Sequence, residues 1–205
     1  IIGSAELLEN GLVKPEDQPR FLSRIHQEAD RLVALINDIL RLSQLDEGGA
    51  LPHEQVSVLE LAQEAARSLT AQAAAQAVHI SVTGTAGTVF GVRRLLYEIA
   101  RNLCENAVKY NVPGGSVTVE VAETDRDVTL LVRDTGIGIP EGDQSRVFER
   151  FYRVDKSHSR AIGGTGLGLS IVKHAVAYHH GTLRLESQPG KGTVITVTLP
   201  KKPTE

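Results

Sequence analysis

The sequence is poor in cysteine, in long apolar runs and in excess charge of either sign. Cys104 is the single cysteine among 205 residues, which excludes an internal disulfide framework and a cysteine-based zinc site. No apolar run approaches the ~20 residues of a membrane span, and no signal peptide is visible. A formal net charge of −3 indicates no basic surface for nucleic acid. These absences favour a cytoplasmic protein in which Cys104 is a reduced, buried thiol.

The chain also lacks an initiator methionine, and residues 1–8 already have a helical pattern. We therefore expect that it is cut from a longer protein and that its first helix continues upstream. With 41% hydrophobic residues, a chain of this length can form one core with a smaller element, or two small domains.

Two helices are predicted in the first part of the chain. One covers residues 1–10 and ends at Gly11, and the other covers residues 16–46, with Pro15 at its start. Apolar or small residues in the second helix alternate at the three- and four-residue spacing of a helix bundle. They are Leu22, Ile25, Ala29, Leu32, Ile36, Ile39 and Ser43. Because two helices cannot bury such a wide stripe, we expect a dimeric four-helix bundle. The alternative is packing against the rest of the same chain.

A Glu-Gly-Gly linker at residues 47–49 separates this hairpin from a region with a different pattern. Helices are predicted at residues 58–76, 91–111 and 168–178, and a strand at 79–83. Strict alternation predicts one hairpin from 117–121 and 128–132, and a second from 183–185 and 194–199. Helices grouped against an antiparallel-rich sheet indicate a two-layer α+β fold. The predicted domains are therefore a helical one at 1–48 and an α+β one at 49–205.

The first of four motifs is Asn-Leu-Cys-Glu-Asn-Ala-Val-Lys-Tyr at residues 102–110. Asn102 and Asn106 are four residues apart on a predicted helix, so their amides share one face. An amide oxygen is a suitable ligand for Mg²⁺, and Lys109 on the same side can reach a phosphate. The alternative is that all three are ordinary surface residues.

The second motif is Asp-Thr-Gly-Ile-Gly at residues 134–138, directly after a predicted strand. A carboxylate at Asp134 can accept from the exocyclic amine of adenine and so select adenine over guanine. Gly136 and Gly138 allow the backbone to approach the base closely. The alternative is an ordinary turn after a strand.

The third motif, Phe-Glu-Arg-Phe at residues 148–151, lies within a long segment with little apolar periodicity, and the fourth motif follows that segment. Gly164, Thr165, Gly166 and Gly168 lead into a helix, and their N–H groups predict an anion cradle. The spacing does not match a dinucleotide-binding fingerprint. Residues 139–163 have the length of a lid that Phe148 and Phe151 would pin. This segment carries cations that could neutralise phosphate charge, namely Arg150, Arg153, Lys156 and Arg160. The alternative is that they are solvated surface charges.

None of the seven histidines has metal-ligand spacing, and we interpret all of them as structural or surface residues. They are His26, His53, His79, His158, His174, His179 and His180.

Taken in order, the four motifs resemble those of the catalytic half of a bacterial sensor histidine kinase of two-component signalling. Residues 102–110 resemble the N box of that family, 134–138 its first glycine box, 148–151 its F box and 164–168 its second glycine box. Residues 1–46 resemble the dimerisation and phosphoacceptor domain, most closely that of the phosphate-regulon type. The resemblance covers essentially the whole chain. It implies the ATP-binding fold shared with gyrase, heat-shock chaperone and mismatch-repair ATPases.

The resemblance also implies ATP and Mg²⁺ as cofactors. It makes Asn106 the magnesium ligand, puts Lys109 at a phosphate and Tyr110 beside the nucleotide, and makes Asp134 the adenine-binding residue. The implied catalytic residues are Asn102, Asn106, Lys109 and Arg153. Further nucleotide-binding residues implied are Gly136, Gly138, Ile139, Phe148, Gly164, Thr165, Gly166, Leu167 and Gly168.

Two features depart from the family pattern. The phosphoacceptor motif is absent and is expected just upstream of Ile1, and the sequence around His26 does not replace it. We therefore expect this chain to be unable to phosphorylate itself. The family often has an acidic residue where Val92 stands, so no acidic role is assigned there. The implied partners are a second copy of the chain and a response-regulator receiver domain, with a membrane anchor only in missing parts of the parent protein.

The implied reaction moves the γ-phosphoryl group of ATP to a histidine and then to a response-regulator aspartate, which requires mainly positioning and charge neutralisation. Related ATPases carry a glutamate where Asn102 stands. Since an amide is a poor base, ATP hydrolysis should be slow. Three alternatives remain: a hydrolysing ATPase, a non-catalytic nucleotide-sensing scaffold and a protein-serine kinase of the same fold.

Overall fold

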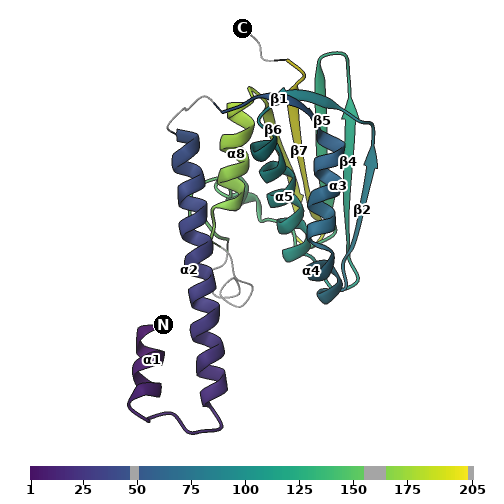
Figure 1. Ribbon diagram of the computed structural model, residues 1–205. Coiled ribbons are helices and arrows are strands. Elements are labelled where there is room, and N and C mark those ends of the chain that lie inside the picture. The colour runs from purple at the N-terminus through teal and green to yellow at the C-terminus, as the bar shows by residue number, and fades with distance from the viewer. Residues whose placement is uncertain (47–50, 155–164, 203–205) are drawn as a thin grey trace.

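A computed structural model of the chain describes residues 1–46, 51–154 and 165–202. The N-terminal part is a helical hairpin of α1 (Ile2–Glu9) and α2 (Gln18–Asp46). Figure 1 shows α1 beside the first turns of the long α2, with the α+β part of the chain at the other end. The predicted helical pair is confirmed, and Gly11 adopts the left-handed conformation after α1, with φ of 64°.

The second part of the chain contains a mixed five-stranded sheet in the order β2-β4-β5-β7-β6. Adjacent strands are antiparallel except β2 and β4, which are parallel. The strands are β2 (His79–Gly84), β4 (Ser116–Glu123), β5 (Asp127–Asp134), β6 (Thr182–Gln188) and β7 (Gly192–Pro200). Both predicted hairpins, β4–β5 and β6–β7, are confirmed. Alternate residues such as Val128, Leu130 and Val132 are buried, so one face of the sheet is covered.

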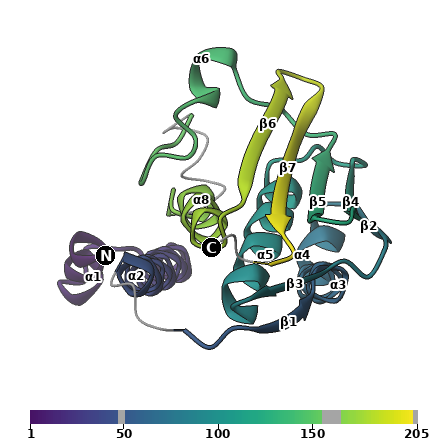
Figure 2. The ribbon, with the colours of Figure 1, turned by 90° about the horizontal axis from the view of Figure 1, so that it is seen from above.

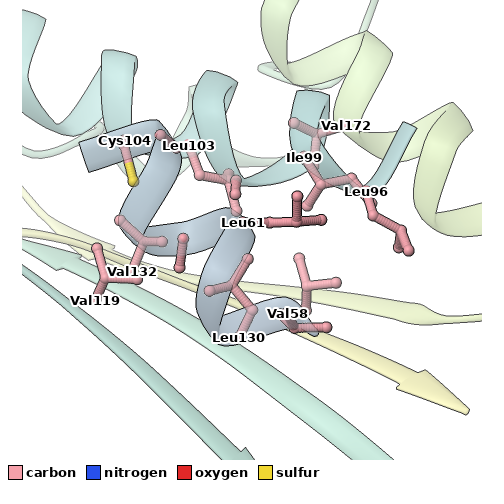
Figure 3. Packing of buried hydrophobic residues seen from close by; sticks show 14 of the residues in the cluster. Val58, Leu61, Leu96, Ile99, Leu103, Cys104, Val119, Leu130, Val132 and Val172 are labelled. Atoms are coloured by element: carbon pink, nitrogen blue, oxygen red, sulfur yellow. The ribbon is translucent and has the colours of Figure 1, made fainter. Parts of the chain in front are cut away.

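Helices cover that face and form a second layer. They are α3 (Val58–Ser68), α4 (Thr70–Ala75), α5 (Arg93–Lys109) and α8 (Gly168–Tyr178), and the short α6 (Glu141–Gln144) lies near the end of β6. In Figure 3, Leu96 and Ile99 of α5 lie on one side of the core, and Val119 and Leu130 of the sheet lie on the other. The expected two-layer fold is confirmed.

Cys104 lies in this core, as the sequence predicted. It is a free cysteine with no exposed surface. Burial raises the pKa of its thiol to about 12, because the core cannot solvate a thiolate. Cys104 is therefore a neutral structural residue.

The prediction of one helix over residues 58–76 was wrong, because the helix is interrupted at Leu69. The hydroxyl of Ser68 donates to the carbonyl of Ala65, and that of Thr70 donates to the carbonyl of Arg67. Such local bonds compete with the helical ladder. Leu69 itself turns into the core, where only 4% of it is exposed.

A two-stranded antiparallel ribbon, absent from the sequence predictions, lies at the start of the α+β part of the chain. It consists of β1 (Glu54–Ser57) and β3 (Thr88–Gly91). The N–H of Phe90 donates to the carbonyl of Lys201, so the ribbon also holds the chain after β7. In consequence β1, the first strand after the helical hairpin in the sequence, is held by its pairing with β3.

The helical hairpin packs against the α+β part through α2 and α8. Leu35 of α2 contacts a small core of Leu167 and Ile171, both almost fully buried. Figures 1 and 2 show α8 between α2 and α5. The alternative of packing within one chain is thus observed in part, yet Leu32 and Ile36 of α2 remain 49% and 56% exposed.

Within the described ranges, none of the helices combines the length and the apolar composition that crossing a membrane requires.

Candidate functional site

The amides of Asn102 and Asn106 on α5 both lie beside Gly168, the first residue of α8. A Cβ atom placed on Gly168 would be 2.9 Å from Oδ1 of Asn102 and 3.8 Å from Nδ2 of Asn106. The absence of a side chain at Gly168 therefore allows the start of α8 to approach both amides closely. The N box and the second glycine box, which are far apart in sequence, meet at this point.

Glu98 lies one turn before Asn102 on α5 and orients the side-chain amide of Asn102. Nδ2 of Asn102 donates to the Glu98 carbonyl at 2.8 Å and contacts Oε2 of Glu98 at 3.4 Å. Since both partners accept hydrogen bonds, the amide oxygen points the other way, toward Gly168. Glu98 is 7% exposed. The sequence analysis did not identify this residue, although its four-residue spacing from Asn102 could have indicated the contact.

Lys109 and Tyr110 lie at the C-terminal end of α5. Nζ of Lys109 lies 5.5 Å from the centre of the Tyr110 ring, within cation–π range. Burial raises the pKa of Tyr110, the nearby Arg153 guanidinium opposes that rise, and Glu105 adds to it. The structure therefore brings Arg153, which was predicted to be catalytic, close to the N box.

Tyr110 also contacts the loop that carries the first glycine box. Its carbonyl accepts from the N–H of Ile137 at 3.1 Å. A Cβ atom on Gly136 would be 2.3 Å from that carbonyl, so only glycine allows this approach. The loop at residues 134–138 is thereby fixed against the end of α5.

Asp134 is half-buried at the end of β5, and its carboxylate holds two backbone N–H groups. Oδ1 accepts from Gly136 at 2.8 Å and from Thr193 at 3.2 Å. Burial raises the pKa of this carboxyl, while these two hydrogen bonds favour the charged form and oppose the rise. Both bonds go to Oδ1, which fixes the orientation of the carboxylate.

Ile139 and Gly138 continue the loop onto the β6–β7 hairpin. Gly138 has φ of 67°, and a Cβ atom there would be 2.1 Å from the Gln188 carbonyl. The N–H of Ile139 donates to the Ser187 hydroxyl at 2.8 Å. Thr193 and Ser187 therefore support the predicted site residues, and the sequence analysis missed both. Their separation of 59 and 48 residues from the partners left no local signal.

The F box crosses the second glycine box. The N–H of Phe151 donates to the carbonyl of Gly166 at 2.9 Å. Phe151 has φ of 65°, which is rare for an aromatic residue, and it is 58% exposed. Phe148 is half-buried. Arg150 bonds Nε2 of His174 on α8 at 3.2 Å, so it is not simply a solvated charge.

The described part of the second glycine box begins at Thr165. The Thr165 hydroxyl accepts from the N–H of Leu167 at 3.3 Å, Gly166 has φ of 75°, and Leu167 is fully buried against α2. The box thus makes a tight turn into the N-terminus of α8. Several predicted residues lie outside the described residues, namely Lys156, His158, Arg160, Gly163 and Gly164.

A hollow of about 330 Å³ also lies near Asp134. Arg133 and Val194, which line it, alternate with the buried Val132 and Ile195. It therefore opens on the sheet face turned away from the helices. The amides of α5 do not line it, whereas Asp134 and Ser187 do, so this hollow borders the candidate site at the end of β5.

Comparison with known families agrees with this arrangement. Residues 91–203 match the family described as histidine kinase-, DNA gyrase B- and HSP90-like ATPase. Residues 1–48 match the His kinase A (phospho-acceptor) domain. The first match contains all four motifs, and the second contains the helical hairpin.

Individual proteins show the same relationship. The chain is 40% identical over 210 residues to the sensor-like histidine kinase SenX3 of Mycolicibacterium smegmatis, covering 98% of this chain and 54% of that protein. The chain thus spans about half the length of this relative. The mycobacterial sensor histidine kinase MprB shares 33% identity and a TM-score of 0.64, over 75% of this chain and all of that one. Full-length ShkA in complex with AMPPNP shares 27% identity and a TM-score of 0.75, over 97% of this chain and 42% of that one. The chain belongs to the sensor histidine kinases of two-component systems, and residues 91–203 are its ATPase-type nucleotide-binding domain.

Proposed function

We propose that this chain is the ATP-binding catalytic portion of a sensor histidine kinase. It transfers the γ-phosphoryl group of Mg-ATP to a histidine for relay to a response-regulator aspartate. The observation that carries the proposal is the close approach of Asn102 and Asn106 to Gly168, which sets a polar helix face beside a helix N-terminus.

The amides of α5 fit a magnesium ion. Asn106 supplies a neutral oxygen donor, which Mg²⁺ accepts beside phosphate and water oxygens. The Glu98 contact turns the Asn102 oxygen toward Gly168, beside Asn106. When bound, the ion would neutralise phosphate charge. We assign Asn106 as the protein ligand.

The phosphate groups require cations and N–H donors. The N-terminus of α8, with Gly166 and Gly168, presents N–H groups and the positive end of the helix dipole. Lys109 and Arg153, both near Tyr110, add positive charge. The Thr165 hydroxyl lies within the same turn. Positioning and charge neutralisation are what phosphoryl transfer requires from a protein.

The base is held at the other end of the site. In this proposal Oδ2 of Asp134 accepts from the exocyclic amine of adenine, and Gly136 and Ile139 frame the base. Guanine presents an oxygen at that position, which a carboxylate repels. The carboxylate therefore selects ATP over GTP.

Asn102 distinguishes phosphoryl transfer from hydrolysis. Its amide cannot remove a proton from water, and Glu98 lies behind it, in contact with Nδ2. The phosphoryl group is therefore kept for a histidine acceptor.

The partners follow from the exposed helical hairpin. Leu32 and Ile36 are apolar and exposed on α2, which suits a four-helix bundle with a second copy. We also propose a receiver domain as acceptor of the phosphoryl group. This reaction takes place in the cytoplasm, where ATP is available.

Titration calorimetry with Mg-ATP tests the nucleotide site. We expect binding by the wild type, loss of the Mg²⁺ dependence in Asn106→Ala, and loss of the preference for ATP over GTP in Asp134→Asn. Asn10→Ala, on the exposed end of α1, is the control. Absence of heat with the wild type contradicts the proposal.

Phosphoryl transfer is tested in a longer chain that includes the segment upstream of Ile1. Labelled ATP should give acid-labile, base-stable phosphate on the protein. Acid-stable label would indicate a serine kinase instead, and no label would indicate a scaffold.

A further inference from the structure

The loop that carries Asp134 is pinned along its length by the β6–β7 hairpin. At its start, Asp134 accepts from the N–H of Thr193 on β7. In its middle, the N–H of Gly190 donates to the carbonyl of Ile137 at 2.8 Å. At its end, the N–H of Ile139 donates to the hydroxyl of Ser187 on β6. The position of the carboxylate therefore depends on a hairpin that is remote in sequence.

Ser187 is the junction of this network. Its Oγ lies 2.8 Å from the Ile139 nitrogen, 3.0 Å from the Gly192 carbonyl oxygen and 2.9 Å from Oγ1 of Thr193. A hydroxyl can donate once and accept twice. These three partners fill that capacity when Ser187 donates to Gly192 and accepts from Ile139 and Thr193.

Gln144 of α6 closes the network from the other side. Its Nε2 donates to the carbonyl of Ile139 at 3.0 Å and to that of Ser187 at 2.9 Å. Both polar groups of the Ile139 backbone are thus bonded to Ser187 or Gln144. The end of the adenine loop can shift only if these bonds break.

We propose that Ser187 is a positioning residue for adenine recognition, and that its hydroxyl joins Ile139 to Thr193 so that the Asp134 carboxylate stays aimed at the base. This inference rests on the proposed role of Asp134 in binding the exocyclic amine. Ser187 acts through the loop and does not contact the nucleotide. Gln144 supports the same loop from α6.

A pair of nucleotides separates positioning from general stability. ATP carries the exocyclic amine, whereas purine riboside 5′-triphosphate has the same ring and phosphates without it. Loss of the Ser187 hydroxyl leaves the N–H of Ile139 unpaired, so the loop relaxes and the amine contact weakens. A defect of the fold as a whole would weaken the binding of both nucleotides alike.

The experiment measures the Kd of both nucleotides, with Mg²⁺ present, for the whole chain. We expect Ser187→Ala to weaken ATP binding about fivefold and binding of the purine analogue less than about twofold, in line with the loss of one hydrogen bond. Ser187→Thr, which keeps the hydroxyl, should restore ATP binding. Thr182→Ala, at an exposed position of the same strand, should change the Kd of neither nucleotide. Gln144→Ala, outside the sheet, should repeat the ATP-specific loss even if Ser187→Ala fails to fold.

The outcomes distinguish this inference from the function on which it rests. Equal weakening of both ligands in Ser187→Ala and Gln144→Ala, or no change in either, overturns the positioning role alone. A wild type that binds the two nucleotides equally well overturns the adenine-binding role of Asp134, and the role of Ser187 with it.

Discussion

The imidazole of His179 accepts a hydrogen bond from the backbone N–H of Val92, with 3.0 Å between the two nitrogens. His179 follows α8, and Val92 precedes α5. Nδ1 of His179 donates to the carbonyl of Ala175 at 2.7 Å, so the ring is neutral and its tautomer is fixed. Gly91 provides the space, because a Cβ atom there would be 2.6 Å from the ring. The two helices that we propose to form the phosphate end of the site are thus joined at their far ends.

This contact predicts a pH-dependent stability. Burial lowers the pKa of His179, the nearby His53 and His180 lower it further, and the bond to Ala175 opposes them. In the unfolded chain a histidine titrates near ~6.5. The neutral His179 therefore makes its full contribution to the free energy of unfolding above that pH. This contribution is lost as the pH falls through the lower pKa of the folded state, and the free energy of unfolding then changes by up to about 1.4 kcal/mol per pH unit.

Urea denaturation between pH 5 and pH 8 measures this slope. The matched variant is His179→Gln, whose amide oxygen can accept from Val92 without titrating. In the variant, the slope of the free energy of unfolding against pH should be smaller by the amount that one titrating group produces. An identical slope in the two proteins would contradict the assignment.

Gly168→Ala tests the close approach of α8 to the α5 amides. The added methyl group would be 2.9 Å from Oδ1 of Asn102. We expect Mg-ATP to bind at least about tenfold more weakly, because a displaced amide and a narrowed cradle affect both ion and phosphate. The melting temperature should change little, because the Asn102 side chain can turn away. Gly142→Ala is the control, since its Cβ atom would meet nothing within 4 Å. Equal affinities in both variants would show that the cradle is not used.

Asn102→Glu tests the distinction between transfer and hydrolysis. A second carboxylate beside Glu98 would have a raised pKa and could act as a base near neutral pH. Phosphate release from ATP should rise about tenfold or more over the wild type, measured by a coupled assay. A wild type that hydrolyses ATP faster than the variant would exclude the role assigned to the amide.

The exposed face of α2 predicts a dimer. Analytical ultracentrifugation of the wild type should give twice the mass of the chain, and Leu32→Asp combined with Ile36→Asp should give a monomer. The physical reason is that these side chains, 49% and 56% exposed in one chain, are buried between two copies. Phe90→Asp, 40% exposed on the β1–β3 ribbon, serves as the control and should remain dimeric. A monomeric wild type at micromolar concentration would refute the bundle.

Much of the fold was predictable because its signals are local. Strict alternation in 117–121 and 128–132 predicted the β4–β5 hairpin, and helical periodicity in 91–111 predicted α5. The β1–β3 ribbon was missed because each of its strands has only four residues. The interruption at Leu69 was missed because Ser68 and Thr70 stop the helix without a proline or a glycine. The parallel pairing of β2 with β4 depends on a crossover through β3 and α5, which periodicity does not encode.

The sequence by itself determined the four motifs and with them the residues that we propose to hold a nucleotide, since these follow from residue types at short spacing. Only the tertiary structure decided that Gly168 faces Asn102, and that Ser187, Thr193 and His179 support the candidate site. Most of these contacts join residues separated by 48 to 87 positions. Such pairs are brought together by the packing of helices on the sheet, and local patterns in the chain carry no information about that packing.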